Sequence, residues 1–322
     1  MPLPFTGPWL LAPMEGVTDR AFRAEVLERN PPHALGGAFT EFVRVVDHAV
    51  PRRVLREHLG ADRGQPTFHA PVGLQLMGRR LDVVAASARR AVELGAPLVD
   101  LNFGCPAKGA LRGCAGSALL RDPRAVEDLV RAVVGAVGEL VPVSAKIRAG
   151  FDDDTRLEEL ARRVEQAGAS LLTVHCRTKK ESYRPEVDWT RIRRAVESVS
   201  IPVCGNGGVQ GHADLERMRA ETGCAYVMVG QAALADPWIF TGREVTRAEA
   251  ARFLYDYAEA MRASGVAARG AAARVKQLLR AWTAGGLVES EAQRAAWLRE
   301  QDPLALIEGF RELSRARAAQ IA

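Results

Sequence analysis

One cysteine lies where its chemistry could be used. Cys105 belongs to the hexapeptide Leu101-Asn-Phe-Gly-Cys-Pro106, in which an apolar run gives way to a turn containing glycine and proline. A thiol with an ordinary pKa of about 8.5 is mostly protonated at neutral pH, so it can donate a proton without special tuning. The alternative is a buried structural cysteine, the usual fate of a free thiol. The position alone leaves both interpretations open.

Two glycine-containing segments have the composition of anion-binding loops. They are Cys204-Gly-Asn-Gly-Gly-Val209 and Val229-Gly-Gln-Ala-Ala-Leu234, and each contains or follows an apolar run. Glycines allow backbone N–H groups to close on a phosphate. Each segment alone could be an ordinary turn, but the two together indicate a phosphorylated ligand or cofactor. Flavin mononucleotide (FMN) is the first candidate.

Two pairs of basic residues have the spacing of one strand face. In Lys146-Ile-Arg148 and His175-Cys-Arg177 the basic residues are two apart, so both members of a pair point the same way from a strand. A cation near the pyrimidine edge of a flavin favours its anionic reduced form, and we assign Lys146 to that role. Gln75 and Asn102 are candidate neutral partners of the ring or the substrate. The alternative for each lone cation is a salt bridge at the rim.

These residues are compatible with one reaction. A flavin that delivers hydride to one carbon of an activated C=C bond needs a proton donor for the other carbon, and Cys105 could be that acid. The other cysteines are Cys114, Cys176, Cys204 and Cys224, and the five contain no C-x-x-C pair. This spacing argues against a disulfide framework and against a structural metal site, so we expect reduced thiols and no metal.

The elements that must position these residues recur regularly along the chain. The eight predicted strands are residues 10–14, 37–42, 72–77, 98–103, 143–148, 171–177, 201–206 and 226–229, and the predicted helices between them include 82–94, 122–139, 155–167, 190–198 and 212–222. Eight βα units in about 240 residues predict a (β/α)₈ TIM barrel of the α/β class. A doubly wound open sheet is the alternative, but eight consecutive units favour closure.

The barrel also explains the order of the polar residues. Active sites of this fold lie at the carboxyl ends of the strands, and phosphate is usually bound after strands 7 and 8, where the two glycine segments stand. Reading the ends of the predicted strands in order gives Pro13 to Glu15, Glu41, Gln75, Asn102 with Cys105, Lys146 with Arg148, His175 with Arg177, Asn206, and Gly230 with Gln231. We therefore expect these residues to share one site.

The last quarter of the chain has a different character. From residue 243 onward the sequence indicates helices only, at 247–261, 271–283, 289–299 and 303–321. We predict a catalytic barrel over residues 1–242 and a helical domain over 243–322. The N-terminal segment has no basic start before its apolar stretch and contains prolines, so we expect neither a signal peptide nor a membrane span. We expect a cytoplasmic protein that does not bind membranes.

The charge distribution is compatible with an RNA partner. The chain has a formal net charge of +5, and no acidic residue stands between Glu259 and Glu289. The cations gathered there are Arg262, Arg269, Arg274, Lys276 and Arg280. Such a run is usually a solvated helix face, but beside an active site it could follow a phosphate backbone.

Taken in order, the motifs resemble one family, the tRNA-dihydrouridine synthases. The stretches that carry the resemblance are Ala12-Pro-Met-Glu-Gly-Val-Thr-Asp19, the Cys105 hexapeptide, Lys146-Ile-Arg148, Val174-His-Cys-Arg-Thr178, Asn206-Gly-Gly208 and Gly230-Gln231. Glu41-Phe-Val-Arg-Val-Val-Asp47 and Tyr183-Arg-Pro185 are most similar to the bacterial class C branch, which acts on uridine 16 in the tRNA D-loop.

The resemblance implies an FMN-dependent, NADPH-driven reduction of the uracil 5,6 double bond. Hydride would pass from flavin N5 to C6, and Cys105 would protonate C5. The implied flavin contacts are Pro13, Met14, Glu15, Gln75, Lys146 and His175, with Asn206, Gly207, Gly208, Gly230 and Gln231 around the ribityl phosphate. The implied tRNA contacts are Asn102, Arg177, Lys179, Tyr183, Arg184, Arg274, Lys276 and Arg280. We expect a monomer.

Three positions depart from the family pattern. Cys176 stands where glycine is usual, Gln231 where arginine is usual beside the phosphate, and Gly208 where the class C loop commonly has an acidic residue. Loss of the arginine predicts weaker flavin retention. Two other functions remain open: an FMN-barrel oxidoreductase that acts on a free pyrimidine or another small unsaturated molecule, and a non-catalytic tRNA-binding barrel. A reductase for small molecules would not need a basic helical appendage, so tRNA binding discriminates against it. A flavin that is bleached by NADPH and recovers when tRNA is added would exclude the non-catalytic barrel.

Overall fold

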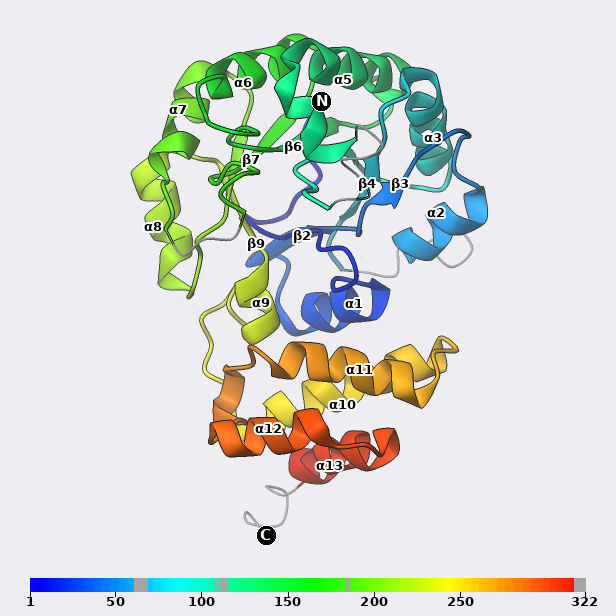
Figure 1. Cartoon of the computed structure of the whole chain (residues 1–322), viewed down its shortest axis with the longest axis vertical. Coiled ribbons are helices and arrows are strands. Elements are labelled where there is room, and N and C mark those ends of the chain that lie inside the picture. The colour runs from blue at the N-terminus through cyan, green and yellow to red at the C-terminus, as the bar shows by residue number, and fades with distance from the viewer. Residues whose placement is uncertain (61–68, 108, 110–114, 183–185, 316–322) are drawn as a thin grey trace. The chain divides into compact units, whose positions relative to one another are not determined.

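The structure is a computed structural model of the chain, and it describes residues 1–60, 69–107, 109, 115–182 and 186–315 (Figure 1). By their contacts these residues form two compact units. The first contains residues 1–20 and 31–230, and the second contains 21–30 and the chain from Gln231 onward. The units meet at residue 230, whereas the predicted catalytic barrel and helical domain meet at residue 242, so this functional boundary stays a prediction.

The first unit is a closed parallel barrel. The described strands are β1 (Trp9–Leu11), β2 (Leu35–Phe39), β3 (Val43–Arg44), β4 (Val72–Met77), β5 (Val99–Phe103), β6 (Val143–Arg148), β7 (Leu171–His175), β8 (Val203–Asn206) and β9 (Tyr226–Val229). They pair in the order β2-β1-β9-β8-β7-β6-β5-β4-β3, and a further pairing of β2 with β4 closes eight of them into a ring. The predicted (β/α)₈ barrel is confirmed, with β3 as an addition at the side of β4.

Helices surround the barrel in chain order (Figure 1). They are α2 (Arg52–Leu59), α3 (Leu81–Glu93), the 3₁₀ helix η1 (Gly116–Arg121), α5 (Pro123–Val137), α6 (Leu157–Gln166), α7 (Thr190–Ser198) and α8 (Ala213–Thr222). In α5 the Asp122 carboxylate accepts a hydrogen bond from the N–H of Arg124, which caps the helix, and proline occupies the first turn. The buried face of α5 repeats at Val126, Val130, Val133 and Val137, the spacing of a helix stripe that covers a sheet.

The interior of the barrel changes from apolar to polar along its axis. Leu98, which precedes β5, and Leu171, which begins β7, belong to an apolar cluster with Leu10, Phe39, Cys204 and Met228. Further along the strands the register pairs Asp100 with Ser144, Asn102 with Lys146, and Arg148 with His175. The alternation of a strand therefore presents polar side chains to the interior near the carboxyl ends, above an apolar base.

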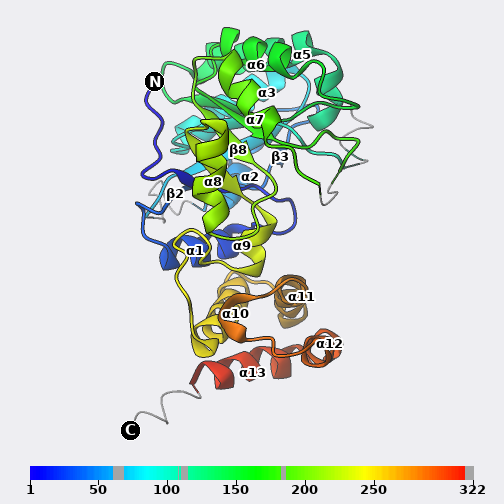
Figure 2. The ribbon, with the colours of Figure 1, turned by 90° about the vertical axis from the view of Figure 1, so that its left-hand side faces the viewer.

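The second unit is helical (Figure 2). It contains α1 (Arg20–Arg29, from residue 21), α9 (Gln231–Ala235), α10 (Arg247–Ala263), α11 (Ala268–Leu279), the 3₁₀ helix η2 (Ala284–Gly286), α12 (Glu291–Arg299) and α13 (Pro303–Arg315). Helix α10 packs against α11 and α13, and the Thr246 and Glu249 side chains form a capping box at its start. The sequence pattern does not predict α1, because its buried side chains include Arg23 and Glu25 as well as apolar ones.

Candidate active site

Cys105 lies directly after β5 in a nearly closed environment. The residue is 8% exposed and packs against Phe42 and Met77. Burial raises the pKa of the thiol, and the Glu15 carboxylate adds to this, while the Ala107 N–H, Arg44 and Arg148 act in the opposite direction. Because the balance raises the pKa, the thiol is protonated at neutral pH, the state that a proton donor needs.

The backbone of Cys105 is held by a chain of side chains from the barrel interior. The Asn102 Oδ1 atom accepts from the N–H groups of both Gly104 and Cys105. The Asn102 Nδ2 atom donates to Gln75 Oε1 over 2.7 Å, and Gln75 Nε2 donates to Asp100 Oδ2 over 2.6 Å. The structure thus brings together three residues predicted to share the site, and it adds Asp100 to them.

Lys146 and Asn206 form a second polar pair in the interior. The Lys146 Nζ atom donates to Asn206 Oδ1 over 2.8 Å, and Asn206 Nδ2 donates to the Met228 carbonyl over 2.7 Å. Burial, with repulsion from Arg148, lowers the pKa of Lys146 to about 8. The pKa of His175 is lowered well below its usual value by burial and by the neighbouring cations, so its ring is neutral. The site therefore holds a lysine ammonium beside a neutral imidazole.

The glycine segment after β8 has a backbone that only glycine adopts readily. Gly207 and Gly208 have φ values of +100° and +81°. A Cβ atom on Gly208 would lie 2.6 Å from the Val187 Cγ1 atom. The Trp189 Nε1 atom donates to the Gly207 carbonyl over 3.0 Å and fixes the turn. The departure at Gly208 therefore has a steric reason: this loop leaves no room for a side chain as it stands.

Gly230 follows β9, the strand that pairs with β8, and so lies near the glycine segment after β8. Asn206 pairs with Met228 in the register of β8 and β9, so the residues two positions further on, Gly208 and Gly230, follow neighbouring strands. Met14 approaches Gly230 from the end of β1, with its sulfur 3.4 Å from where a Cβ atom would be. Gln231 begins α9 in the other unit. Its predicted phosphate contact stays a prediction.

Arg148 joins the Cys105 turn to the segment after β7. This buried side chain donates from Nε to the Gly104 carbonyl over 2.7 Å. Its Nη1 atom donates to the carbonyls of Thr178 and Ser182, each over 3.2 Å. One guanidinium therefore links the proton-donor turn to the segment that carries the predicted tRNA contacts Arg177 and Lys179.

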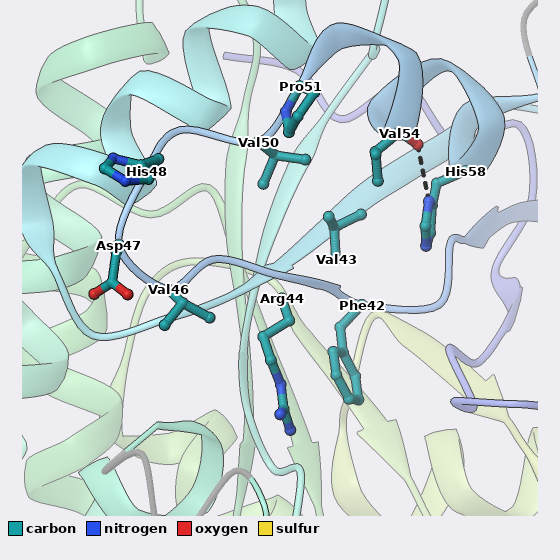
Figure 3. A pocket seen from close by; sticks show the side chains of 10 residues that line it. All are labelled: Phe42, Val43, Arg44, Val46, Asp47, His48, Val50, Pro51, Val54 and His58. Atoms are coloured by element: carbon teal, nitrogen blue, oxygen red, sulfur yellow. Dashed lines mark hydrogen bonds between the residues drawn. The ribbon is translucent and has the colours of Figure 1, made fainter.

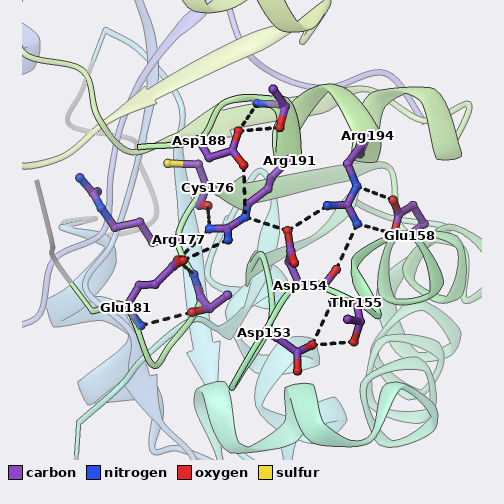
Figure 4. A network of polar contacts seen from close by, with 12 residues as sticks. Asp153, Asp154, Thr155, Glu158, Cys176, Arg177, Glu181, Asp188, Arg191 and Arg194 are labelled. Atoms are coloured by element: carbon purple, nitrogen blue, oxygen red, sulfur yellow. Dashed lines mark hydrogen bonds and ion pairs between the residues drawn. The ribbon is translucent and has the colours of Figure 1, made fainter. Parts of the chain in front are cut away.

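A charged network fixes the outer side of that segment (Figure 4). The Arg191 guanidinium bonds to Glu181 over 2.7 Å, to Asp154 over 2.8 Å and to the Cys176 carbonyl over 3.1 Å. Arg194 binds the same Asp154 carboxylate over 2.8 Å. The buried Cys176 thus supplies its backbone to this network.

The remaining predicted contacts are distributed more widely. Pro13 and Met14 are half-buried and Glu15 is exposed after β1. The Lys179 ammonium lies 5.0 Å from the centre of the Phe151 ring. Tyr183 and Arg184 lie outside the described residues.

The cations of α11 that were predicted to contact tRNA differ in their hydrogen-bond partners and in the helix face on which they lie. The Lys276 Nζ atom donates to the Glu300 carbonyl directly after α12, whereas Arg274 donates to Gln277 over 3.2 Å. At about 100° per residue, Arg269, Lys276 and Arg280 fall on one helix face, and Arg274 falls well away from it. Arg269 and Arg280 are exposed.

A pocket of about 450 Å³ lies beside β3 and α2, apart from the predicted site residues (Figure 3). Its lining includes Phe42, Arg44, Val54 and His58. The His58 Nδ1 atom lies 2.9 Å from the Val54 carbonyl, so this nitrogen carries the proton. Phe42 also contacts the Cys105 cluster. This aromatic ring therefore contacts both the pocket and the Cys105 cluster.

The described ranges contain neither a metal-binding cluster nor a membrane-spanning helix. No group of three or more His, Cys, Asp or Glu side chains there could hold a metal ion. No helix in that part of the chain has both the length and the apolar composition needed to cross a bilayer.

Sequence reasoning missed one member of the site, Asp100, together with its hydrogen-bond donor Ser144 on β6, which lies outside the chain of bonds that leads to Cys105. Both are buried in the barrel interior, and the Ser144 hydroxyl donates to Asp100 Oδ1 over 2.5 Å. The signal that could have found Asp100 is an acidic residue inside the apolar strand run Leu98-Val-Asp-Leu101. Such a residue is expensive to bury and needs partners on neighbouring strands.

A closed parallel barrel with polar side chains gathered at the carboxyl ends of its strands defines an enzyme of the (β/α)₈ class. Residues 10–311 match the family model described as "Dihydrouridine synthase (Dus)". The chain belongs to the dihydrouridine synthase family.

Three relatives illustrate the similarity, and each is named tRNA-dihydrouridine(16) synthase. The protein of Shewanella oneidensis is 40% identical over 230 residues, which cover 71% of this chain and 72% of that protein. The protein of Haemophilus influenzae is 38% identical over 231 residues, with coverage of 71% and 74%. The protein of Pasteurella multocida is 35% identical over 257 residues, with coverage of 77% and 81%.

Proposed function

We propose that this chain reduces the 5,6 double bond of uridine 16 in the tRNA D-loop to dihydrouridine, with FMN as cofactor and NADPH as reductant. The observation that carries the proposal is the buried thiol of Cys105 at the carboxyl end of β5, on a turn whose N–H groups are held by Asn102, in a barrel whose interior also holds a buried lysine. The names of the relatives support tRNA as the substrate and position 16 as the target.

The residues at the barrel mouth suit FMN. In the part of the chain that the structure describes, the backbone N–H groups of Gly207, Gly208 and Gly230 donate to no acceptor, so they are available to a phosphate. The Lys146 ammonium places a positive charge in the interior, as the electron-rich edge of a reduced flavin requires. FMN, when bound, supplies the hydride.

Cys105 supplies the proton. Its S–H bond breaks as a C–H bond forms at C5 of the uracil, and sulfur is left as a thiolate that regains a proton from solvent. Because burial raises the pKa of the thiol, the proton stays on sulfur until negative charge develops on the base. The bond from Arg148 to the Gly104 carbonyl holds the turn while this transfer occurs.

The α11 helix face is the proposed tRNA contact. Arg269, Lys276 and Arg280 extend over about 16 Å of one helix face, a length that reaches several phosphates of an RNA strand. A double Arg269→Ala and Arg280→Ala variant is expected to bind tRNA more weakly and with a salt slope smaller by roughly 1 to 2. Arg311→Ala on α13 removes a partly exposed cation that pairs with Glu308, and this control should leave both quantities unchanged.

Purified protein tests the chemistry. The chain should contain FMN that is bleached by NADPH and recovers when tRNA lacking dihydrouridine is added. Cys105→Ala should still be bleached by NADPH but should not form dihydrouridine. Cys224→Ala removes a different buried thiol and serves as the matched control, with activity retained. Bleaching without recovery on tRNA, but with recovery on a free pyrimidine, would assign the chain to a small-molecule substrate instead.

A further inference from the structure

Asp100 is a charged side chain in the middle of the barrel. It is 1% exposed, and each of its carboxylate oxygens accepts one hydrogen bond, from Ser144 Oγ over 2.5 Å and from Gln75 Nε2 over 2.6 Å. Burying a carboxylate costs free energy even when it is hydrogen-bonded, and an apolar side chain would fill the same space without this cost. The position therefore calls for an explanation beyond packing.

Because Asp100 is charged, it determines which way the neighbouring amide side chains must face. A carboxylate only accepts, so Gln75 must turn its NH₂ group toward Asp100 and its oxygen toward Asn102. Asn102 must then turn its NH₂ group toward Gln75 and its oxygen toward the backbone N–H groups of Gly104 and Cys105. If both amides were reversed, an NH₂ group would face those N–H groups and the bonds to the Cys105 turn would be lost.

We propose that Asp100 is a positioning residue, which as a carboxylate sets the direction of the hydrogen-bond chain through Gln75 and Asn102 and so holds the Cys105 turn in place for proton transfer. This inference rests on the proposed function, in which Cys105 is the donor. Asp100 lies two residues along the same strand from Asn102 but acts on the turn through Gln75 of the neighbouring strand.

The groups that face Asp100 keep it ionised near neutral pH. They are Gln75 on β4, Ser144 and Lys146 on β6, and the Cys204 thiol on β8. Burial raises the pKa of Asp100 to about 6, while the two hydrogen bonds and the Lys146 charge oppose the rise. The thiol of Cys204 stays neutral because burial raises its pKa well above the usual value. Below pH 6 a protonated Asp100 can donate to Gln75, and the reversed chain becomes possible.

The test is the pH dependence of dihydrouridine formation in a single turnover of the holoenzyme with saturating tRNA. The wild-type rate should fall as the pH decreases through about 6. Asp100→Asn, which can face Gln75 with either atom of its amide, should be several-fold slower at pH 8 and should lack this acid limb. Asp100→Leu, with no acceptor, should be slower by roughly 10- to 100-fold, the size expected for a misplaced catalytic group.

Ser144→Ala is the matched variant. It removes a bond to the carboxylate but leaves Gln75 in place, so the rate at pH 8 should be close to that of wild type while the acid limb moves to higher pH. A merely structural role for Asp100 would change stability without moving this limb. An acid limb that persists in Asp100→Asn, or that stays in place in Ser144→Ala, would overturn the proposal.

A second readout needs neither RNA nor turnover. Alkylation of Cys105 by iodoacetamide at pH 8, followed by peptide mass spectrometry, should be several-fold faster in Asp100→Leu than in wild type, because the turn loses its hydrogen bonds. Ser144→Ala should match wild type. Unchanged alkylation in Asp100→Leu would contradict the positioning role. Dihydrouridine formation by Cys105→Ala would instead refute Cys105 as the proton donor, and a wild-type protein that forms no dihydrouridine would refute the proposed function, so these failures are distinguishable.

Discussion

Replacing Gly208 by alanine tests how the loop after β8 is built. The backbone there has φ of +81°, which costs an L-residue about 1–2 kcal/mol. The new Cβ atom would also lie 2.6 Å from Val187 Cγ1 and 3.0 Å from its Cβ and Cγ2 atoms. Val187 is 39% exposed and can move, so we take the lower end of the overpacking range, about 1–2 kcal/mol. The expected loss in the free energy of unfolding is about 2–4 kcal/mol.

Urea denaturation followed by circular dichroism measures this loss. The matched control is Gly211→Ala in the same loop, where a Cβ atom would meet no atom within 4 Å, and its stability should stay within about 1 kcal/mol of wild type. Adding Val187→Ala to Gly208→Ala should restore the steric part and leave the backbone part. Equal stabilities for Gly208→Ala and Gly211→Ala would refute the explanation of this glycine.

Three further predictions concern charges and caps. Arg191→Ala should lower the free energy of unfolding by about 2–3 kcal/mol, as urea denaturation would show, because it leaves the Glu181 carboxylate without its ion pair; an effect below about 0.5 kcal/mol would contradict the network. The raised pKa of Asp100 makes its contribution to stability largest at low pH and lost as the pH rises through 6. Wild type relative to Asp100→Asn should therefore gain about 1–1.5 kcal/mol between pH 8 and pH 5, and a difference independent of pH would refute the shift. Thr246→Ala should cost about 1 kcal/mol through loss of the Glu249 capping box, whereas an unchanged melting temperature would argue against the cap.

Much of the barrel could be predicted because its strands are apolar runs with clear ends. Strands β4, β6 and β9 begin and end at the predicted residues, as does α7. The strand β3 is too short to be recognised in a sequence, with only Val43 and Arg44. Local patterns thus determined the positions of the longer elements, while β3 depends on pairing with β4.

The sequence predicted most of the residues of the site but not the hydrogen bonds between them. Gln75, Asn102 and Cys105 stood out as polar groups near strand ends, yet nothing in their spacing shows that one amide bonds to the next. Asp100 looks like an ordinary strand residue until β4 and β6 bring partners to it. Lys276 was predicted to meet tRNA, and its bond to the backbone after α12 depends on helix packing that the sequence does not encode locally.

The most direct measurement of the central claim is the mass analysis of tRNA treated with this protein. Transfer RNA from a strain lacking the gene is incubated with NADPH and either wild-type protein or Cys105→Ala, and each nucleoside position is mapped. We predict that wild type adds two hydrogens to uridine 16, and that Cys105→Ala adds none although NADPH reduces its flavin equally well. Dihydrouridine formed by Cys105→Ala at the wild-type rate would contradict the account.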